Sequence, residues 1–122
     1  MSQQEIYLGN PNLKRANVAQ NFTPEEVEEF VKCSKDPVYF ITNYIKIISL
    51  DLGLVPFELY PFQADMVNKF HDNRFNIAKL PRQSGKSTVV TAYLLWYSIF
   101  NDNVNVAILA NKAATAREML QR

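Results

Sequence analysis

The first quarter of the chain changes from a polar stretch to a helical pattern. Residues 1–22 are polar, with Gly9, Pro11 and several Asn, and we expect them to form an extended or loosely held arm. Thr23 can cap a helix, Pro24 suits the first helical position, and Glu26 completes a capping box. Val27, Phe30 and Val31 then fall on one helical face. A helix is therefore predicted to begin at Pro24.

The remaining pattern predicts four more helices and two strands. The expected helices begin at Asp36-Pro37, at Pro61, at Gly85 and after Asn111, and the expected strands are Arg74 to Leu80 and Val104 to Ala110. The helix from Gly85 to Phe100 is apolar nearly all round, which predicts burial on most sides. Strand, helix and strand in this order predict a parallel βαβ unit. The fold class is α/β, with a small helical subdomain at 23–56 before a domain at 57–122.

Three isolated features carry no chemistry in this interpretation. Ile47 to Asp51 resembles a metal-binding strand, but it precedes the loop described below, and Gly53 and Pro56 interrupt the pattern after it. Cys33, the single cysteine, is expected to be a small buried residue, and His71, the single histidine, a surface residue near a helix end.

The segment from Leu80 to Thr88, Leu-Pro-Arg-Gln-Ser-Gly-Lys-Ser-Thr, has the pattern of a phosphate-binding (Walker A) loop between a strand and a helix. Gly85 lets the backbone approach a phosphate, and the loop N–H groups with the helix N-terminus supply partial positive charge. Lys86 can reach the β- and γ-phosphates, and Ser87 offers a hydroxyl to Mg²⁺. Thr88 is expected near the α-phosphate. The predicted cofactors are ATP and Mg²⁺.

Two further features extend this site. Leu80 stands where the general motif has its first glycine, so other residues must make the turn, helped by Pro81. Arg82 is either a surface charge beside a polyanion or a contact to the γ-phosphate that acts as an arginine finger in cis. Phe62 could stack on adenine, and Gln63 could pair with the base edge or simply face solvent. The full predicted binding set is Phe62, Gln63, Arg82, Gln83, Ser84, Gly85, Lys86, Ser87 and Thr88, with Arg82 and Lys86 as catalytic residues and Ser87 as metal ligand.

Composition adds little to this picture. The formal net charge of +1 argues neither for nor against nucleic acid, and 48% hydrophobic residues is typical of a globular protein. The longest nearly apolar run, Val89 to Phe100, is too short to span a bilayer, so no membrane partner is expected.

Pro-Phe-Gln at 61–63, Pro-Arg-Gln-Ser-Gly-Lys-Ser-Thr at 81–88 and Val-Ala-Ile-Leu-Ala-Asn-Lys at 106–112 together resemble the large terminase subunit of tailed bacteriophages, of the myovirus type. The resemblance runs from about Tyr7 to the end of the chain. It implies a RecA-like P-loop ATPase (ASCE) core that hydrolyses ATP to move double-stranded DNA into the prohead, a finger role for Arg82, and adenine contacts for Phe62 and Gln63. It also implies a ring of subunits, the portal and the small terminase subunit as partners, and the cytoplasm of an infected bacterium as location.

Two alternatives stay open, a superfamily 2 helicase-like ATPase and a non-catalytic interaction module with a vestigial loop. No strand ending in Asp-Glu follows Ala110, and the nuclease domain of the terminase family is also missing. We therefore expect the chain to be the N-terminal part of a longer protein, and to lack ATPase activity by itself.

Overall fold

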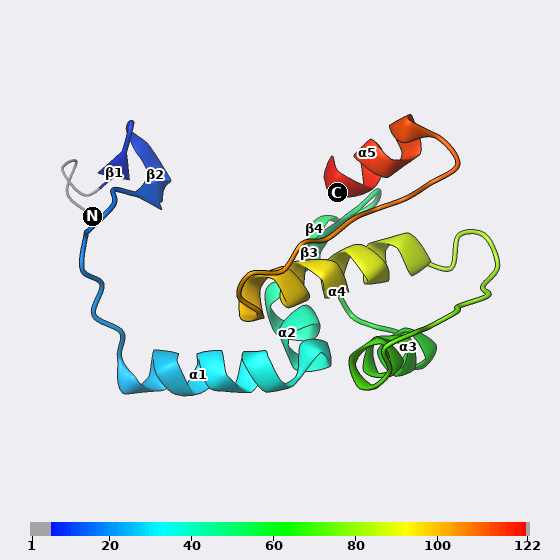
Figure 1. Cartoon of the computed structure of the whole chain (residues 1–122), viewed down its shortest axis with the longest axis horizontal. Helices are drawn as coiled ribbons and strands as arrows, with labels where there is room; N and C mark the ends of the chain where they lie inside the picture. The colour runs from blue at the N-terminus through cyan, green and yellow to red at the C-terminus, as the bar shows by residue number, and fades with distance from the viewer. Residues whose placement is uncertain (1–5, 122) are drawn as a thin grey trace.

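The computed structural model describes residues 6–121, which form five helices and two small antiparallel hairpins (Figure 1). The first hairpin pairs β1 (Ile6–Tyr7) with β2 (Asn10–Lys14). It stands apart from the rest of the molecule at the end of the irregular segment 15–23 (Figure 1). The predicted arm is therefore partly a hairpin, and residues 1–5 of that prediction lie outside the described residues.

Helices α1 (Pro24–Lys35) and α2 (Pro37–Tyr44) confirm the predicted helical pair. At α1 the Thr23 hydroxyl accepts the Glu26 N–H at 3.2 Å, and the Glu26 carboxylate accepts the Thr23 N–H at 2.9 Å. At α2 the Asp36 carboxylate accepts the N–H groups of Val38 and Tyr39. Both helix starts are thus closed by side chains of the chain itself, as residues of this type favour.

A hairpin that the sequence pattern did not predict follows α2. Strands β3 (Lys46–Ser49) and β4 (Gly53–Pro56) pair antiparallel, with Ile47 opposite Val55. Gly53 adopts φ +71°, the left-handed conformation that glycine tolerates best, at the end of the connecting turn. Gly53 and Pro56 therefore shape an edge hairpin, whereas the sequence interpretation took them to interrupt structure.

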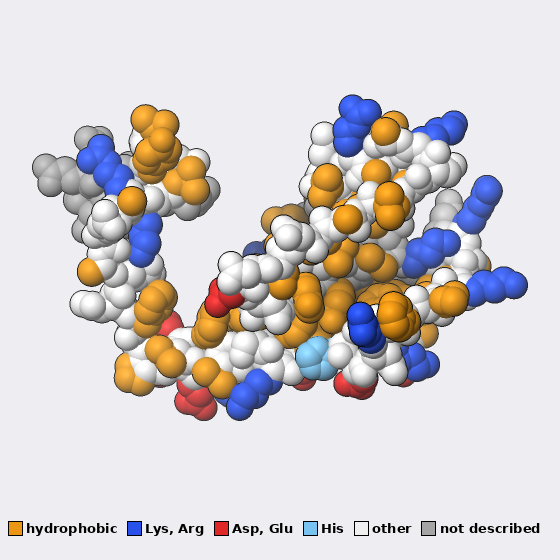
Figure 2. All heavy atoms as spheres, in the orientation of Figure 1, with side chains coloured by type: hydrophobic (Ala, Val, Ile, Leu, Met, Phe, Trp, Pro, Cys, Tyr) orange, Lys and Arg blue, Asp and Glu red, His pale blue; other side chains and the backbone are white. Residues whose placement is uncertain are grey.

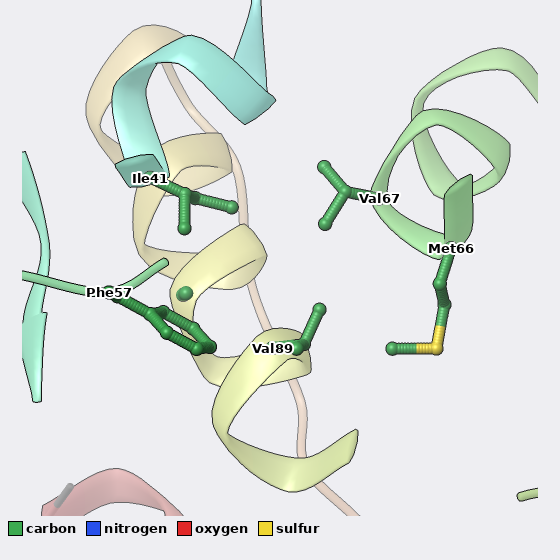
Figure 3. Close-up of a cluster of buried hydrophobic side chains, with 6 residues drawn as sticks. Ile41, Phe57, Met66, Val67 and Val89 are labelled. Atoms are coloured by element: carbon green, nitrogen blue, oxygen red, sulfur yellow. The ribbon is translucent and has the colours of Figure 1, made fainter. Parts of the chain in front are cut away.

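The core lies where α2 meets α3 (Pro61–Asp72) and α4 (Lys86–Phe100). Figure 3 shows the side chains of these helices pointing toward one another, together with Phe57 from the link after β4. The buried cluster consists of Ile41, Phe57, Met66, Val67, Val89 and Ala92. It draws on both the 23–56 and the 57–122 segments, so it fixes α4 and the start of the preceding loop relative to α2.

The two predicted strands at 74–80 and 104–110 are not formed. Both segments run as irregular chain, and neither pairs in a ladder within residues 6–121. The prediction of a parallel βαβ sheet is therefore not met by the structure, and the observed pairing is antiparallel. An isolated extended segment needs the N–H and C=O groups of a neighbour to become a strand, and α4 between the two segments supplies none. Phe75, Ile77 and Leu109 project from these segments fully or almost fully exposed.

Helix α4 is less buried than its composition predicted. Val89, Ala92 and Trp96 are buried, while Leu95 and Ile99 are about half exposed. The predicted burial of α4 on most sides is therefore met only in part, since the two segments expected to form a sheet beside it stay irregular. The last helix, α5 (Ala113–Gln121), follows 104–110. Within residues 6–121, no helix combines the length and apolarity that a membrane span requires.

Candidate phosphate-binding site

The loop predicted to bind phosphate connects an irregular segment to the first residue of α4. Its turn is made by Arg82 and Gln83, and Gln83 adopts φ +59°, an unfavourable conformation for a residue with a side chain. The Ser84 hydroxyl donates to the Pro81 carbonyl at 3.0 Å and closes the turn. Side-chain contacts and a left-handed Gln83 therefore replace the missing first glycine.

Gly85 is the residue on which the loop becomes a helix. It adopts φ +72° and provides the N-cap of α4, and its carbonyl accepts the first helical hydrogen bond from Val89 at 3.0 Å. Among the described residues, no side chain caps this helix start. The N–H groups of the first turn, in Lys86, Ser87 and Thr88, carry the positive end of the helix dipole. Backbone donors in this arrangement are suited to an anionic oxygen.

The two cations of the loop are placed differently. The Lys86 ammonium donates to the carbonyl of Leu80, the first residue of the loop, at 3.3 Å. Arg82 is exposed at the turn. Figure 2 shows several Lys and Arg side chains at the edge of the molecule where the chain between α3 and α4 runs in Figure 1. An ammonium that donates to a carbonyl can exchange this carbonyl for a phosphate oxygen, which gives a stronger, charge-assisted bond.

The side chain of Gln63 on α3 is hydrogen-bonded to the backbone of the loop. Its side-chain N–H donates to the Ser84 carbonyl at 3.1 Å, and its side-chain oxygen accepts the Tyr60 N–H at 3.0 Å. Only 3% of Gln63 is exposed. The contact with adenine expected for Gln63 stays a prediction, and the structure gives this side chain a second role in supporting the loop.

A cavity of about 740 Å³ opens between the loop and the link that precedes α3. Of the predicted binding residues, Phe62, Gln63, Arg82, Gln83, Ser84, Gly85 and Thr88 line it, and Lys86 and Ser87 do not. The cavity brings the two sequence motifs together on one site. The fold thus places seven of the nine predicted binding residues around one cavity.

Tyr60 is a site residue that the sequence interpretation missed. Its ring stacks on Phe62 with 6.1 Å between centroids and an interplanar angle of 6°, and both rings line the cavity. Two parallel rings at a cavity wall are suited to an aromatic ligand. The position of Tyr60 just before the Pro-Phe-Gln motif was the available signal for its role.

Residues from outside both motifs, Ile47 of β3 and Phe57, also line the cavity. The unpredicted hairpin therefore contributes to the site. Among residues 6–121, no group of three or more His, Cys, Asp or Glu side chains is placed to hold a metal ion. Ser87, the second residue of α4, could supply one hydroxyl to Mg²⁺, and water and phosphate oxygens would have to supply the others.

A larger hollow, of about 910 Å³, lies between the end of α3 and the later turns of α4. It is lined by Tyr93, Trp96 and Tyr97 together with His71 and Arg74, and by none of the predicted binding residues. His71 sits exposed in the last turn of α3, as expected, with its ring edge-on to Trp96. The Trp96 indole N–H donates to the Cys33 carbonyl at 2.7 Å and joins α4 to α1.

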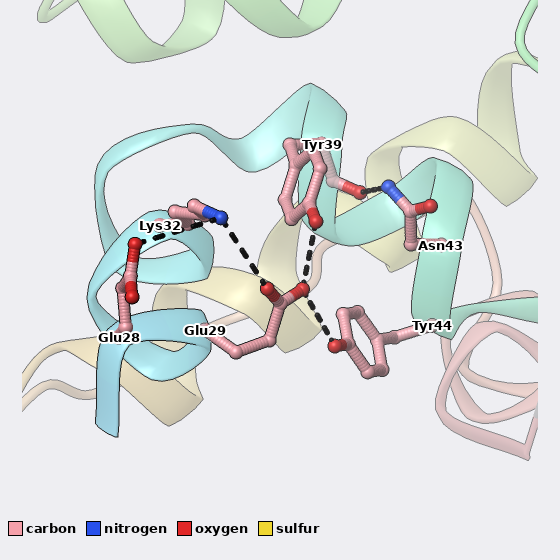
Figure 4. Close-up of polar contacts among 6 residues, drawn as sticks. All are labelled: Glu28, Glu29, Lys32, Tyr39, Asn43 and Tyr44. Carbon is pink, nitrogen blue, oxygen red and sulfur yellow. Dashed lines mark hydrogen bonds and ion pairs between the residues drawn. The ribbon is translucent and has the colours of Figure 1, made fainter. Parts of the chain in front are cut away.

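A polar cluster between α1 and α2 was not predictable from spacing in the sequence. One oxygen of Glu29 accepts the hydroxyls of Tyr39 at 2.7 Å and Tyr44 at 2.8 Å (Figure 4). These bonds, the Tyr39 bond first, lower the pKa of the Glu29 carboxyl. The bond to Glu29 raises the pKa of Tyr44 to about 12. The cluster fixes α2 against α1 without facing the loop.

Cys33 is buried as expected, and its burial raises the pKa of the thiol.

No sequence profile of a known protein family matches the chain.

Proposed function

We propose that this chain binds the triphosphate of ATP, with Mg²⁺, in the loop before α4. The observation that carries the proposal is the helix start at Gly85, where a left-handed residue and an uncapped first turn present backbone donors to one side of the loop. The Lys86 ammonium, which donates to the Leu80 carbonyl, adds a positive charge to the same loop. A phosphate group satisfies all of these donors at once.

The cavity beside the loop supports a nucleotide in preference to free phosphate. Its volume of about 740 Å³ accommodates a small organic ligand. The stacked rings of Tyr60 and Phe62 provide an aromatic wall for a base. A nucleoside triphosphate whose phosphates bind the loop would direct its base toward this aromatic wall.

For the biological role, we propose the N-terminal part of the ATPase domain of a viral DNA-packaging motor, the terminase large subunit. This part of the proposal rests on the resemblance of the motifs at 61–63, 81–88 and 106–112. Arg82, exposed at the turn of the loop, would then contact the γ-phosphate. Double-stranded DNA, the portal and the small terminase subunit are the partners that this role implies, and the host cytoplasm is its location.

The experiment that tests the proposal is a titration of a fluorescent ATP analogue with Mg²⁺ against the wild-type chain and Lys86→Ala. Removing the ammonium eliminates a charge-assisted contact worth about 1.5–3 kcal/mol, so affinity falls about 10- to 100-fold. Lys79→Ala removes an exposed lysine just outside the loop and serves as the matched control, with unchanged affinity expected. Equal binding by all three proteins, or none by any of them, contradicts the proposal.

A second candidate function, a module that docks on a partner protein, is favoured by one observation. Val27 and Phe30 on α1 are more than half exposed, although they share the apolar face of that helix. A module with a vestigial loop predicts the negative result of the same titration, with no effect of Lys86→Ala.

A further inference from the structure

The carboxamide of Gln63 connects α3 to the phosphate loop across 21 positions of sequence. The bond to the Ser84 carbonyl is the side-chain contact by which α3 holds the loop backbone, and the bond to the Tyr60 N–H fixes the other end of the same amide. Both heteroatoms of the amide are therefore engaged inside the protein.

Gly85 shows how closely the loop approaches this amide. A Cβ atom built on Gly85 would lie 2.7 Å from Gln63 Nε2, and this nitrogen is the only side-chain atom so close to it. Gly53 offers the comparison, because it has nearly the same φ, +71° against +72°, and nothing within 4 Å of its built Cβ. The glycine in the loop is thus required twice, for its conformation and for the space occupied by Gln63.

Recognition of adenine places different demands on the same amide. A glutamine that reads adenine uses its oxygen and its nitrogen together, on N6 and N7 of the base. With 3% of its surface exposed and both atoms bonded to backbone, Gln63 can offer that pair only by leaving the loop. The observed bonds favour support of the loop.

We propose that Gln63 is a positioning residue that sets the Ser84–Gly85 backbone for a polyphosphate, whatever base is attached. The inference rests on the proposed binding of a triphosphate by this loop. It adds that Gln63 acts through the loop backbone, and that its contribution is the same for ATP, GTP and inorganic tripolyphosphate.

The test measures the binding of Mg²⁺ complexes of these three ligands to the full chain by calorimetry. Gln63→Ala removes both bonds, and Gln63→Met removes them while keeping most of the side-chain volume. Each variant is expected to weaken the binding of all three ligands by about tenfold, the effect of losing the one buried bond that joins Gln63 to the loop. Asn68→Ala removes an exposed carboxamide of the same helix and should leave every affinity unchanged.

A second arm separates positioning of the loop from a purely structural role. Gly85→Ala and Gly53→Ala are introduced into wild-type and Gln63→Ala backgrounds. In the wild type, Gly85→Ala should weaken tripolyphosphate binding several-fold more than Gly53→Ala, and much of that excess should disappear once Gln63 is removed. A role confined to the stability of α3 would lower the melting temperature and leave affinities measured well below it unchanged, which overturns the proposal.

The remaining outcomes are also decisive. A loss confined to ATP shows that Gln63 reads adenine and overturns the inference while leaving the proposed function intact. Unfolding of both Gln63 variants at 20 °C overturns it too, because it assigns the side chain to the whole fold and not to the loop. Absence of binding of all three ligands by the wild type is the failure of the proposed function itself.

Discussion

Helices α1 and α4 begin in opposite ways. At α1 the side chains of Thr23 and Glu26 cap the helix start. Pro24 has no N–H group, so the first helical position has no donor that would need a partner. At α4 the same place is taken by Gly85, which has no side chain, and the first-turn donors face the loop. Side chains of the protein cap the start of α1, whereas no side chain among the described residues caps the start of α4.

The difference extends to the surroundings of each helix. Around α1, the carboxylate of Glu29 collects two tyrosine hydroxyls and stabilises the contact with α2. Around the start of α4, Gln83 and Gly85 adopt left-handed conformations, and the Lys86 ammonium donates to the Leu80 carbonyl. A residue with a side chain in the left-handed conformation, such as Gln83, is frequent at binding sites. The comparison separates the part of the chain that stabilises the fold from the part that we propose binds a ligand.

The largest effect is expected from Gly85→Ala. A left-handed alanine costs about 1–2 kcal/mol, and displacement of Gln63 from its buried bonds adds about 1–3 kcal/mol. Gly53→Ala carries the first cost alone, because nothing lies near its built Cβ. Urea unfolding of both variants should show the larger loss of unfolding free energy for Gly85→Ala. Equal losses would contradict the close contact between α3 and the loop.

Trp96→Phe should have the next largest effect. It removes the indole donor and leaves the Cys33 carbonyl without that partner in a buried contact, which costs about 1–3 kcal/mol of unfolding free energy. Affinity for ATP should not change, since Trp96 does not line the cavity at the loop. Thermal melting combined with an ATP titration measures both. A change in affinity without a change in stability would contradict the separation.

Thr23→Ala should destabilise the chain by about 1 kcal/mol through loss of the cap. Thr23→Ser keeps the hydroxyl and is the matched control, expected to remain close to the wild type. Chemical unfolding followed by circular dichroism is the measurement. Neither substitution should alter ATP binding, and a reduced affinity in Thr23→Ala alone would tie α1 to the site.

The smallest effect concerns pH. The pKa of Glu29 is lowered from its ordinary value of 4.5 by the Tyr39 and Tyr44 hydroxyls. The stability that this carboxylate contributes is therefore fully present above pH 4.5 and is lost as the pH falls through the lower pKa of the folded state. Unfolding free energies between pH 7 and 3 should fall more steeply for the wild type than for Glu29→Gln. Parallel curves would show that the tyrosine bonds do not favour the ionised form.

The helices were predictable because their signals are local. Thr23, Pro24 and Glu26 lie within four residues and specify a helix start regardless of what packs on it. The same holds for the Gly-Lys-Ser sequence at 85–87 and for Pro61. The motifs at 61–63 and 81–88 also line one cavity. The sequence predicted that both motifs bind the same ligand, but it could not predict the cavity.

The two strand predictions were wrong because a strand depends on a partner that is distant in sequence. A pattern such as Val104 to Ala110 reports that a segment is suited to a sheet, but the sheet requires a partner that the pattern does not name. The β3–β4 hairpin was missed because Gly53 and Pro56 are compatible with both interruption and an edge strand. The Glu29 cluster could not be anticipated either, since its partners are 10 and 15 positions away on another helix.

The most direct test of the central claim follows the backbone amides of the isotope-labelled chain by NMR while Mg²⁺–ATP is added. We predict that the largest shifts occur in the N–H signals of Ser84 to Thr88, where the first turn of α4 would receive the phosphates. Lys86→Ala should reduce these shifts at the same ligand concentration. Shifts confined to α1 and α2, or no shifts at saturating nucleotide, would contradict the assignment of the loop as a phosphate site.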